Sequence, residues 1–394
     1  MRIALYAPLK PPDHPVPSGD REMARLLIRA LGAAGHQVAP VSDLRVFLRA
    51  PDQGLLARAR AEARAEAARI EALWRREGPP DLWLCYHPYY KSPDLLGPAL
   101  CARHGVAYAT VESSWSRRRD AGDWGVAQQA VRAGLRQAVL NIALTARDAR
   151  GLAEAEPGAA IARLAPFIDT APFAAPPRPR PARLVTAAMM RPGDKLSSYL
   201  AMARALGRLG GPWRLDIAGD GPARAEVARA FAPFGARVRL LGRLDPLALA
   251  ELFAGGWLYL WPGHGEAYGL ATLEAQAAGL PVVAERTAGL PEVVHHGRTG
   301  LLTAPGDEEA LAAAVAALAG DRLRRDCMAR LARRHVWRAH GLEGAGRRLD
   351  RLLVVAVARG RAGGARGGGA GDGYLDNEED RGRDPAAGGA EGSA

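Results

Sequence analysis

The sequence contains few cysteines: Cys85, Cys101 and Cys327 are scattered over 394 residues. So few thiols at such spacings cannot form a disulfide framework or a zinc cage, and we expect small buried residues instead. No apolar run approaches the roughly 18 to 20 residues that a membrane-spanning helix needs. The first apolar residues lead into a proline-rich loop from Pro8 onward, which is not the layout of a signal peptide. These absences predict a cytoplasmic protein without a cysteine-held metal.

Lysine is also scarce, because all but Lys10, Lys91 and Lys195 of the 53 basic residues are arginines. The net charge of +11 raises the question of nucleic acid. The arginines are dispersed through Ala- and Arg-rich helical stretches such as 55–76 and form no stripe, so we expect no nucleic-acid partner. A basic surface would instead favour peripheral contact with the inner, anionic face of a membrane, or a phosphorylated substrate. Where arginine dominates so strongly, each surviving lysine is a candidate for a specific role.

An apolar content of 48% with 24% charged residues suits two domains with real cores. Short apolar runs alternate with helical stretches through residues 1–165 and again through 183–335. This pattern predicts two doubly wound α/β domains, each with a parallel sheet covered on both faces. The proline-rich segment 166–182 cannot continue a helix or a central strand and is the predicted linker. A helix is expected over 336–359, and the Gly-, Ala- and charge-rich residues 360–394 are expected to form a disordered tail.

The strand-to-helix loop at residues 261–274 combines the chemistry of an anion site with two carboxylates. In open α/β sheets, ligands bind beyond the carboxyl ends of the strands. A helix that begins near Gly269 presents unpaired N–H groups and the positive end of its dipole, which suits a phosphate. Glu266 precedes this helix and Glu274 lies more than a turn into it, so both flank the anion site and can accept hydrogen bonds from hydroxyls. A phosphate between two hydroxyl-binding groups describes a nucleotide sugar.

The stretch 266–284 resembles the E-x7-E signature region of retaining family-4 glycosyltransferases of the GT-B fold. The segments 289–294 (GLPEVV) and 297–302 (GRTGLL) follow in the family's order, which makes the match specific. The resemblance implies two Rossmann-like domains that face each other across a cleft, with the acceptor on the side of the first domain. It implies retaining transfer of a sugar from a nucleoside-diphosphate sugar to a glycan, lipid-linked or small-molecule acceptor. It also implies that no metal or cofactor is needed and that the C-terminal helix returns towards the first domain.

Donor-site residues follow from this resemblance. It implies that Glu266 contacts the transferred sugar, Glu274 the ribose hydroxyls, and the backbone of Gly269 and Leu270 the diphosphate. Arg243 falls in the strand and loop that border the nucleobase in the family.

Two further cations hold the diphosphate in relatives, in the first loop of the second domain. Here that loop contains Arg191 and Lys195, which are four positions apart. The family usually places the two further apart, and Met stands where the Arg is expected. Either the loop is rearranged and Arg191 serves, or only Lys195 does. Positive charge at this point would stabilise the departing nucleoside diphosphate without a metal.

The first domain supplies candidates on the acceptor side. Gly19 resembles the family's glycine in the loop that approaches the donor, although a helix start that needs a small residue explains it equally well. His87 falls at a strand end where relatives often place a histidine, and Tyr90 follows in the same loop. A lone histidine at a strand end is as often satisfied by backbone.

Glu112 is a departure from the family, whose members usually end this strand with a cleft histidine. It could hydrogen-bond a hydroxyl of the donor sugar, accept a proton from the acceptor, or bind a cationic acceptor. It could also be a surface carboxylate paired with Arg117, Arg118 or Arg119. That arginine triplet could in turn hold a phosphorylated or lipid-linked acceptor, or be a solvated charge run.

Two other functions remain open. A nucleotide-sugar epimerase on the same fold would use the same donor pocket, and a non-catalytic nucleotide-sugar binder would explain the altered positions of Glu112 and Arg191. The Gly-Asp-Gly-Pro turn at 219–222 lacks the third glycine of a dinucleotide fingerprint and is interpreted as a structural turn.

Overall fold

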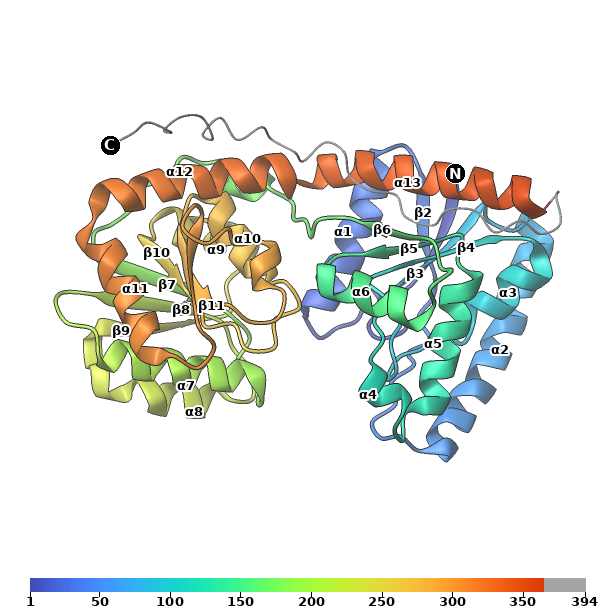
Figure 1. Ribbon diagram of the computed structural model, residues 1–394, viewed down its shortest axis with the longest axis horizontal. Coiled ribbons are helices and arrows are strands. Elements are labelled where there is room, and N and C mark those ends of the chain that lie inside the picture. Colours follow the sequence, from blue (N-terminus) through green and yellow to red (C-terminus); the bar gives the residue numbers. More distant parts are fainter. Residues whose placement is uncertain (365–394) are drawn as a thin grey trace, which may run out of the picture.

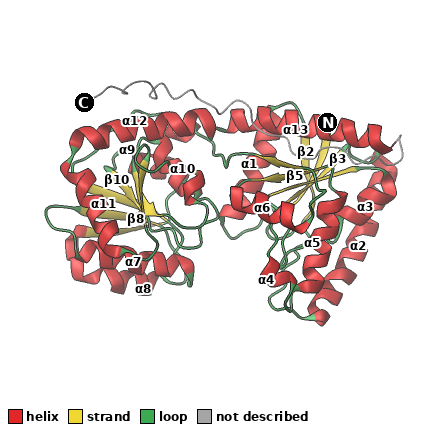
Figure 2. Ribbon diagram, in the orientation of Figure 1, coloured by secondary structure: helices red, strands yellow, loops and turns green. Residues whose placement is uncertain are grey.

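A computed structural model describes residues 1–364 of the chain. Two six-stranded sheets, in which every strand pairing is parallel, lie side by side with helices packed around them (Figures 1 and 2). The first sheet has the order β2-β1-β3-β4-β5-β6 and the second β12-β11-β10-β7-β8-β9. These are two doubly wound domains, as the alternation of apolar runs and helical stretches predicts.

The first domain alternates strand and helix from its first residues. Its strands are β1 Arg2–Tyr6, β2 Gln37–Ser42, β3 Leu82–Tyr86, β4 Ala107–Val111, β5 Leu140–Ala143 and β6 Ile161–Arg163. Its helices are α1 Gly19–Ala33, α2 Gln53–Glu77, α3 Gly97–His104, α4 Arg117–Asp120, α5 Gly125–Gln137 and α6 Ala146–Ala155. The central strand β3 is buried along its whole length, because helices cover both faces of the sheet. Helix α1 begins where the Ser18 hydroxyl accepts a hydrogen bond from the Arg21 N–H (3.2 Å), an N-cap.

The second domain repeats the pattern. Its strands are β7 Arg183–Ala187, β8 Arg214–Ala218, β9 Val238–Gly242, β10 Leu258–Leu260, β11 Val282–Glu285 and β12 Gly300–Thr303. Its helices are α7 Asp194–Gly207, α8 Arg224–Phe231, α9 Pro246–Ala254, α10 Leu270–Ala277 and α11 Glu308–Gly320. Within residues 1–364 the chain also forms three short 3-10 helices, η1 Ala171–Phe173 in the proline-rich segment, and η2 Ala232–Arg237 and η3 Leu290–Glu292 in the second domain.

Two helices in line, α12 (Arg322–Ala339) and α13 (Leu342–Gly364), run along one side of both domains (Figure 1). Helix α12 packs on α10 of the second domain and α13 on α1 of the first. Gly346 allows this second contact, because a Cβ there would lie 2.4 Å from the Ala30 carbonyl oxygen. The helices break at His340, whose carbonyl accepts the Ile168 N–H at 2.9 Å. The chain therefore crosses between the domains twice, once at the proline-rich segment and once at this break.

The end of α13 corrects one prediction. Residues 360–364, expected in the tail, continue the helix because Arg361 pairs with Asp81 of the first domain at 3.0 Å. Residues 365–394 of the predicted tail lie outside the described residues. Among residues 1–364, no helix has the length and apolar character to cross a membrane.

Glu292 of η3 forms a polar bridge between the two domains. One of its carboxylate oxygens accepts the Ala146 N–H at the start of α6 (2.6 Å), and the other contacts Arg163 at 2.8 Å. A carboxylate at a helix N-terminus is favoured by the helix dipole, so this bridge holds the second domain against α6. The carboxyl ends of both sheets thereby face each other, which positions the site.

Candidate functional site

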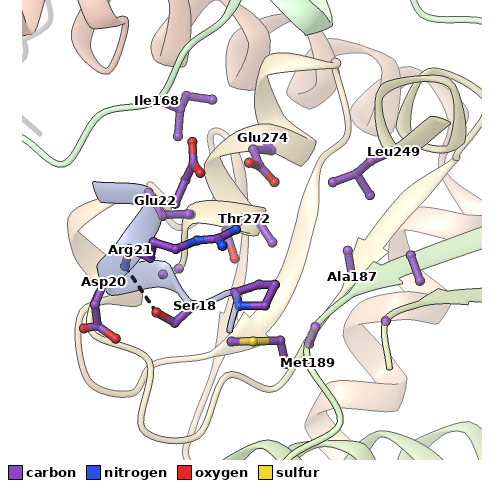
Figure 3. Close-up of a pocket in the computed structure, with 18 of the residues that line it drawn as sticks. Ser18, Asp20, Arg21, Glu22, Ile168, Ala187, Met189, Leu249, Thr272 and Glu274 are labelled. Atoms are coloured by element: carbon purple, nitrogen blue, oxygen red, sulfur yellow. Dashed lines mark hydrogen bonds between the residues drawn. The ribbon is translucent and has the colours of Figure 1, made fainter. Parts of the chain in front are cut away.

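A cleft of about 1010 Å³ lies between the domains, walled by the loops that follow β1, β7, β8, β9 and β10. Figure 3 shows that both domains contribute: Ser18, Asp20, Arg21 and Glu22 come from the start of α1, and Thr272 and Glu274 from α10. Most of the sequence-predicted residues line this cleft, namely Gly19, Glu112, Arg191, Lys195, Arg243, Glu266, Gly269, Leu270 and Glu274. His87 and Tyr90 are not in its wall.

Helix α10 points its N-terminus into the cleft. Gly269 is its N-cap residue and has φ 77°, a left-handed conformation that a side chain would strain. A Cβ there would also lie 3.0 Å from the Thr272 hydroxyl and 3.1 Å from Leu290. The Thr272 and Leu273 N–H groups donate to the Gly269 carbonyl, whereas those of Leu270 and Ala271 have no hydrogen-bond partner among the described residues and are available to an anion in the cleft.

Lys195 and Glu266 form an ion pair inside the cleft. Lys195 stands in the first turn of α7, and Glu266 lies in the loop between β10 and α10. The same oxygen of Glu266 accepts the indole N–H of Trp261 at 2.9 Å, and the Lys195 ammonium lies 5.4 Å from the centre of that ring. Trp261 therefore fixes the carboxylate, and the carboxylate fixes the lysine. An ammonium carries three N–H donors, so Lys195 can hold Glu266 and a phosphate together.

The Gly-Asp-Gly-Pro turn after β8 packs directly on the loop that carries Arg191. A Cβ at Gly219 would lie 1.9 Å from the Ala188 carbonyl oxygen, and one at Gly221 would lie 2.4 Å from that of Met190. The Met190 N–H in turn donates to the Asp220 carbonyl at 2.9 Å. The two glycines thus allow two loops to touch, which is a structural role.

Arg191 reaches across the cleft to the first domain. Its guanidinium donates to the Pro17 carbonyl of the first domain at 2.8 Å. A Cβ at Gly19, two residues further on, would meet no protein atom within 4 Å, so packing inside the protein does not require a glycine there. Gly19 lines the cleft, so the open space beside it lets a ligand approach the backbone.

Glu22 is a cleft residue that the sequence did not indicate. It belongs to the first turn of α1, and its carboxyl group lies beside that of Glu274 in the upper part of the cleft, with Ala187 and Leu249 on the other side (Figure 3). Burial and the negative charge of Glu22 raise the pKa of Glu274 to about 7. Two carboxyl groups from opposite domains thus share one end of the cleft.

Glu112 lies at the boundary between the domains. It follows β4 with φ 59° and is 6% exposed. Its carboxyl accepts a hydrogen bond from the Tyr268 hydroxyl of the second domain at 3.0 Å. The interpretation as a surface carboxylate paired with the arginine triplet is therefore wrong: Arg117 pairs with Glu154 instead. Burial raises the pKa of Glu112 to about 7, although the charge of His87 opposes this rise.

His87 pairs with Asp20, a second residue that the sequence did not indicate. Its Nδ1 lies 3.2 Å from an Asp20 oxygen, and its backbone has φ 58°. Burial alone would lower the pKa of His87, but the hydrogen bond to Asp20 and the negative charge of Glu112 raise it to about 9. His87 is therefore a cation at neutral pH. It sits immediately behind the cleft wall, because Asp20 and Glu112 are part of that wall.

Tyr90 lies away from the cleft, in an aromatic group. Its ring centre is 4.7 Å from that of Trp124, and the Arg119 guanidinium lies 4.6 Å from the ring. Tyr90 thus packs against Trp124 and Arg119 outside the cleft wall, and its role on the acceptor side stays a prediction.

Replacing Glu112 with Gln tests the buried carboxyl. The folded pKa of about 7 exceeds the ordinary value, so the stability that Glu112 contributes is complete at low pH and is lost as pH rises towards 7. Glutamine keeps an acceptor for Tyr268 without the buried charge. We expect Glu112→Gln and wild type to unfold with similar free energy at pH 5, and the variant to be more stable by about 1 to 2 kcal/mol at pH 8. Chemical denaturation at both pH values measures this.

The matched control is Glu154→Gln, which replaces the exposed carboxylate that pairs with Arg117. Its effect on the free energy of unfolding should be the same at both pH values. Destabilisation of Glu112→Gln by the same amount at both pH values would contradict the account of the buried charge.

Comparisons with known proteins find similar sequences and folds. Residues 182–321 match the family Glycosyl transferases group 1. An exopolysaccharide phosphotransferase of Streptomyces coelicolor is 37% identical over 113 residues, which are 28% of this chain and 12% of that protein. The sulfoquinovosyl transferase SQD2 of Arabidopsis thaliana is 34% identical over 133 residues, 32% of this chain and 26% of that protein. These two matches thus span only a minor part of the relatives' length.

Longer matches cover both domains. The glycogen synthase of Mycobacterium tuberculosis is 28% identical over 337 residues, 81% of this chain and 78% of that protein. The structure of a sucrose-phosphate synthase from Thermosynechococcus elongatus superposes with a TM-score of 0.73 at 20% identity, over 91% of this chain and 99% of that one. Anabaena HepE in complex with UDP superposes with a TM-score of 0.67 at 16% identity, over 90% and 100%. The chain therefore has the GT-B fold, and residues 182–321 of its second domain are similar to the family Glycosyl transferases group 1.

Proposed function

We propose that this protein transfers a sugar from a nucleoside diphosphate to an acceptor, with retention of configuration and without a metal ion. The observation that carries the proposal is the Lys195–Glu266 ion pair beside the N-terminus of α10, in the cleft between the two domains of the GT-B fold. A cation and a helix N-terminus are the groups that a diphosphate requires. Structures of HepE with UDP and with UDP-glucose support a nucleotide-sugar donor for this fold.

The cleft has a place for each part of such a donor. Lys195 and the first N–H groups of α10 receive the diphosphate, and Glu266 receives hydroxyls of the transferred sugar. Glu274, on the same helix, receives the ribose hydroxyls. The nucleobase lies towards Arg243 and an apolar wall formed by Ala187, Ala218, Leu244, Pro246 and Leu249.

The reaction replaces one bond at the anomeric carbon. The bond to the diphosphate oxygen breaks and a bond to the acceptor oxygen forms on the same face. The acceptor proton passes to the departing phosphate oxygen, so no nucleophile from the protein is needed. Lys195 and the α10 dipole stabilise the charge that develops on the leaving group, and Glu266 orients the sugar. Arg191, bonded to Pro17 of the opposite domain, keeps the first domain closed over the donor.

Product analysis tests this function. The protein is incubated with UDP-, GDP- and ADP-sugars, with EDTA, in the absence and presence of a set of glycan and lipid acceptors. We expect nucleoside diphosphate to be released only when an acceptor is present. We also expect NMR to show an axial linkage in the product when the sugar is axially linked in the donor. Conversion of the donor sugar without any acceptor would identify an epimerase instead. Binding without turnover over all acceptors would identify a non-catalytic binder.

The pair of Glu22 and Glu274 predicts how donor affinity depends on pH. An ionised Glu274 accepts both ribose hydroxyls, so donor affinity should fall as pH drops below about 7. Glu22→Gln removes the neighbouring negative charge and lowers the pKa of Glu274. We expect the midpoint of the affinity profile to move down by roughly half a pH unit. Calorimetric titration with a nucleotide sugar between pH 5.5 and 8.5 measures the midpoint.

Glu251→Gln, an exposed carboxylate on α9, is the control and should leave the midpoint in place. An unchanged midpoint in Glu22→Gln would show that the two carboxyl groups do not interact.

A further inference from the structure

Lys10 is a buried lysine without a partner. It lies in the loop between β1 and α1 and is 8% exposed. Within residues 1–364 its ammonium makes no hydrogen bond and no ion pair. It is also not among the polar atoms that are both closed off from solvent and unpaired, so the ammonium keeps some contact with solvent. A mostly buried ammonium without a counter-ion is costly, which indicates that something else offsets the cost.

The loop around Lys10 is fixed by arginines from three directions. Four guanidinium groups donate to its backbone carbonyls: Arg45 to Leu9 (3.0 Å), Arg25 to Pro12 (2.7 Å), Arg21 to His14 (2.9 Å) and Arg191 to Pro17 (2.8 Å). These arginines come from α1, from the loop after β2 and from the loop after β7. Because the loop is clamped on both sides, Lys10 has a defined position.

Positive charge exceeds negative charge at this place. Burial and the positive charges of Arg191, Arg45 and Arg21 lower the pKa of Lys10, and the negative charge of Asp20 opposes them. Asp20 already serves His87, at 3.2 Å, and Figure 3 shows it turned away from Glu22. Asp20 therefore faces both His87 and Lys10, with Arg45 bonded to the neighbouring Leu9 carbonyl, and one carboxylate cannot neutralise three cations.

The location relates this cluster to the acceptor. Lys10, Arg45 and His87 follow β1, β2 and β3, which are neighbours in the first sheet, so their carboxyl ends meet at one edge. Lys195 and α10, which receive the donor diphosphate in the proposed function, belong to the second domain. The cluster thus lies in the first domain, behind the part of the cleft wall that contains Asp20 and Arg191, and is separate from the groups that receive the donor diphosphate.

We propose that Lys10 and Arg45 bind a phosphate group carried by the acceptor, so that the acceptor is a phosphorylated molecule. This inference rests on the proposed function and names its substrate class. A lysine point charge and an arginine fork together match a phosphate monoester or diphosphate. The phosphate would supply the counter-charge that Lys10 lacks.

The test measures phosphate binding with the donor site filled. The protein is saturated with the nucleoside diphosphate that it binds, so that inorganic phosphate cannot enter the donor site, and is then titrated with inorganic phosphate at constant ionic strength. We expect phosphate to bind wild type, and Lys10→Met to lose at least about tenfold in affinity. Lys91→Met, a lysine that stacks on Tyr90 and Trp124, is the matched control and should bind phosphate as wild type does.

Thermal unfolding separates a binding role from a structural one. If Lys10 serves a ligand, Lys10→Met without phosphate should unfold at a higher temperature than wild type, because an unpaired buried charge is removed. Phosphate should then raise the midpoint of wild type and leave that of Lys10→Met unchanged. A lower midpoint in Lys10→Met, or equal phosphate binding in both proteins, would overturn the proposal. Absence of nucleotide binding would refute the proposed function and leave the phosphate titration a valid test of the site.

Two sources of the phosphate are distinguished by a second probe. Glycerol 3-phosphate represents a soluble acceptor, and vesicles of phosphatidylcholine with phosphatidic acid represent a lipid headgroup. Lys10-dependent binding of the first alone assigns a soluble phosphorylated acceptor, and Lys10-dependent sedimentation with the vesicles assigns a lipid. Binding of neither would contradict the proposal.

Discussion

Lys195→Ala is expected to weaken donor binding by about 10- to 100-fold and to lower turnover by about 100- to 1000-fold. The larger effect on turnover follows because the charge on the diphosphate grows as the bond to the sugar breaks, and Lys195 acts most strongly on that state. The substitution also leaves Glu266, 15% exposed at its side chain, without its cation in the cleft. Glu266 would then repel the incoming diphosphate.

Calorimetric titration with the nucleotide sugar and steady-state kinetics measure both effects. Lys91→Ala removes the same charge from a different part of the protein, in the first domain, and should leave both parameters within about twofold of wild type. Near-normal turnover in Lys195→Ala would exclude Lys195 as the diphosphate ligand and move that role to Arg191.

Glu266→Gln should separate binding from chemistry. We expect turnover to fall by about 100- to 1000-fold, because a neutral amide holds the sugar hydroxyls less firmly in the transition state. Affinity for the nucleoside diphosphate itself should be kept or should rise. The reason is the ion pair: without the carboxylate, Lys195 directs its whole charge to the phosphate. The glutamine oxygen can still accept the Trp261 N–H, so the loop should keep its shape.

Binding of the free nucleoside diphosphate and turnover of the nucleotide sugar are measured on the same preparation. Glu274→Gln serves as the contrast, because it should weaken nucleotide binding through the ribose. Equal losses of nucleotide affinity and turnover in Glu266→Gln would show that Glu266 acts on the nucleotide and not on the sugar.

The double variant tests the pair as a unit. Lys195 and Glu266 share one hydrogen bond, so their effects on nucleotide binding should not add. We expect Glu266→Gln to raise nucleotide affinity when Lys195 is already Ala, because it removes the carboxylate that repels the diphosphate, and to do so by a different factor than in wild type, where it also releases the Lys195 charge. Additive effects would mean that the ion pair has no influence on the donor.

Local patterns explain why much of the site was predictable. Glu266, Gly269 and Glu274 lie on one loop and the helix that it starts, so their spacing alone places them together. Alternating apolar runs likewise predicted the two parallel sheets, because strands covered on both faces are short and apolar throughout.

Contacts between the domains were not predictable in this way. Tyr268 meets Glu112, and Arg191 meets Pro17, across long separations in the sequence. Glu22 has no local sign of function, since an acidic residue in a first helical turn is ordinary capping chemistry. Helix α13 extends beyond its predicted last residue, where Arg361 forms an ion pair with Asp81, a partner that composition does not reveal. Residues of the first domain therefore acquire their roles only when the second domain is placed against them.

The measurement that tests the central claim most directly is calorimetric titration with UDP, GDP and ADP in EDTA, on wild type and on Lys195→Ala. The account predicts that one of the three binds wild type in EDTA and that Lys195→Ala loses this binding. Binding to none of them, or binding that EDTA abolishes and Lys195→Ala leaves intact, would contradict a metal-independent donor site in this cleft.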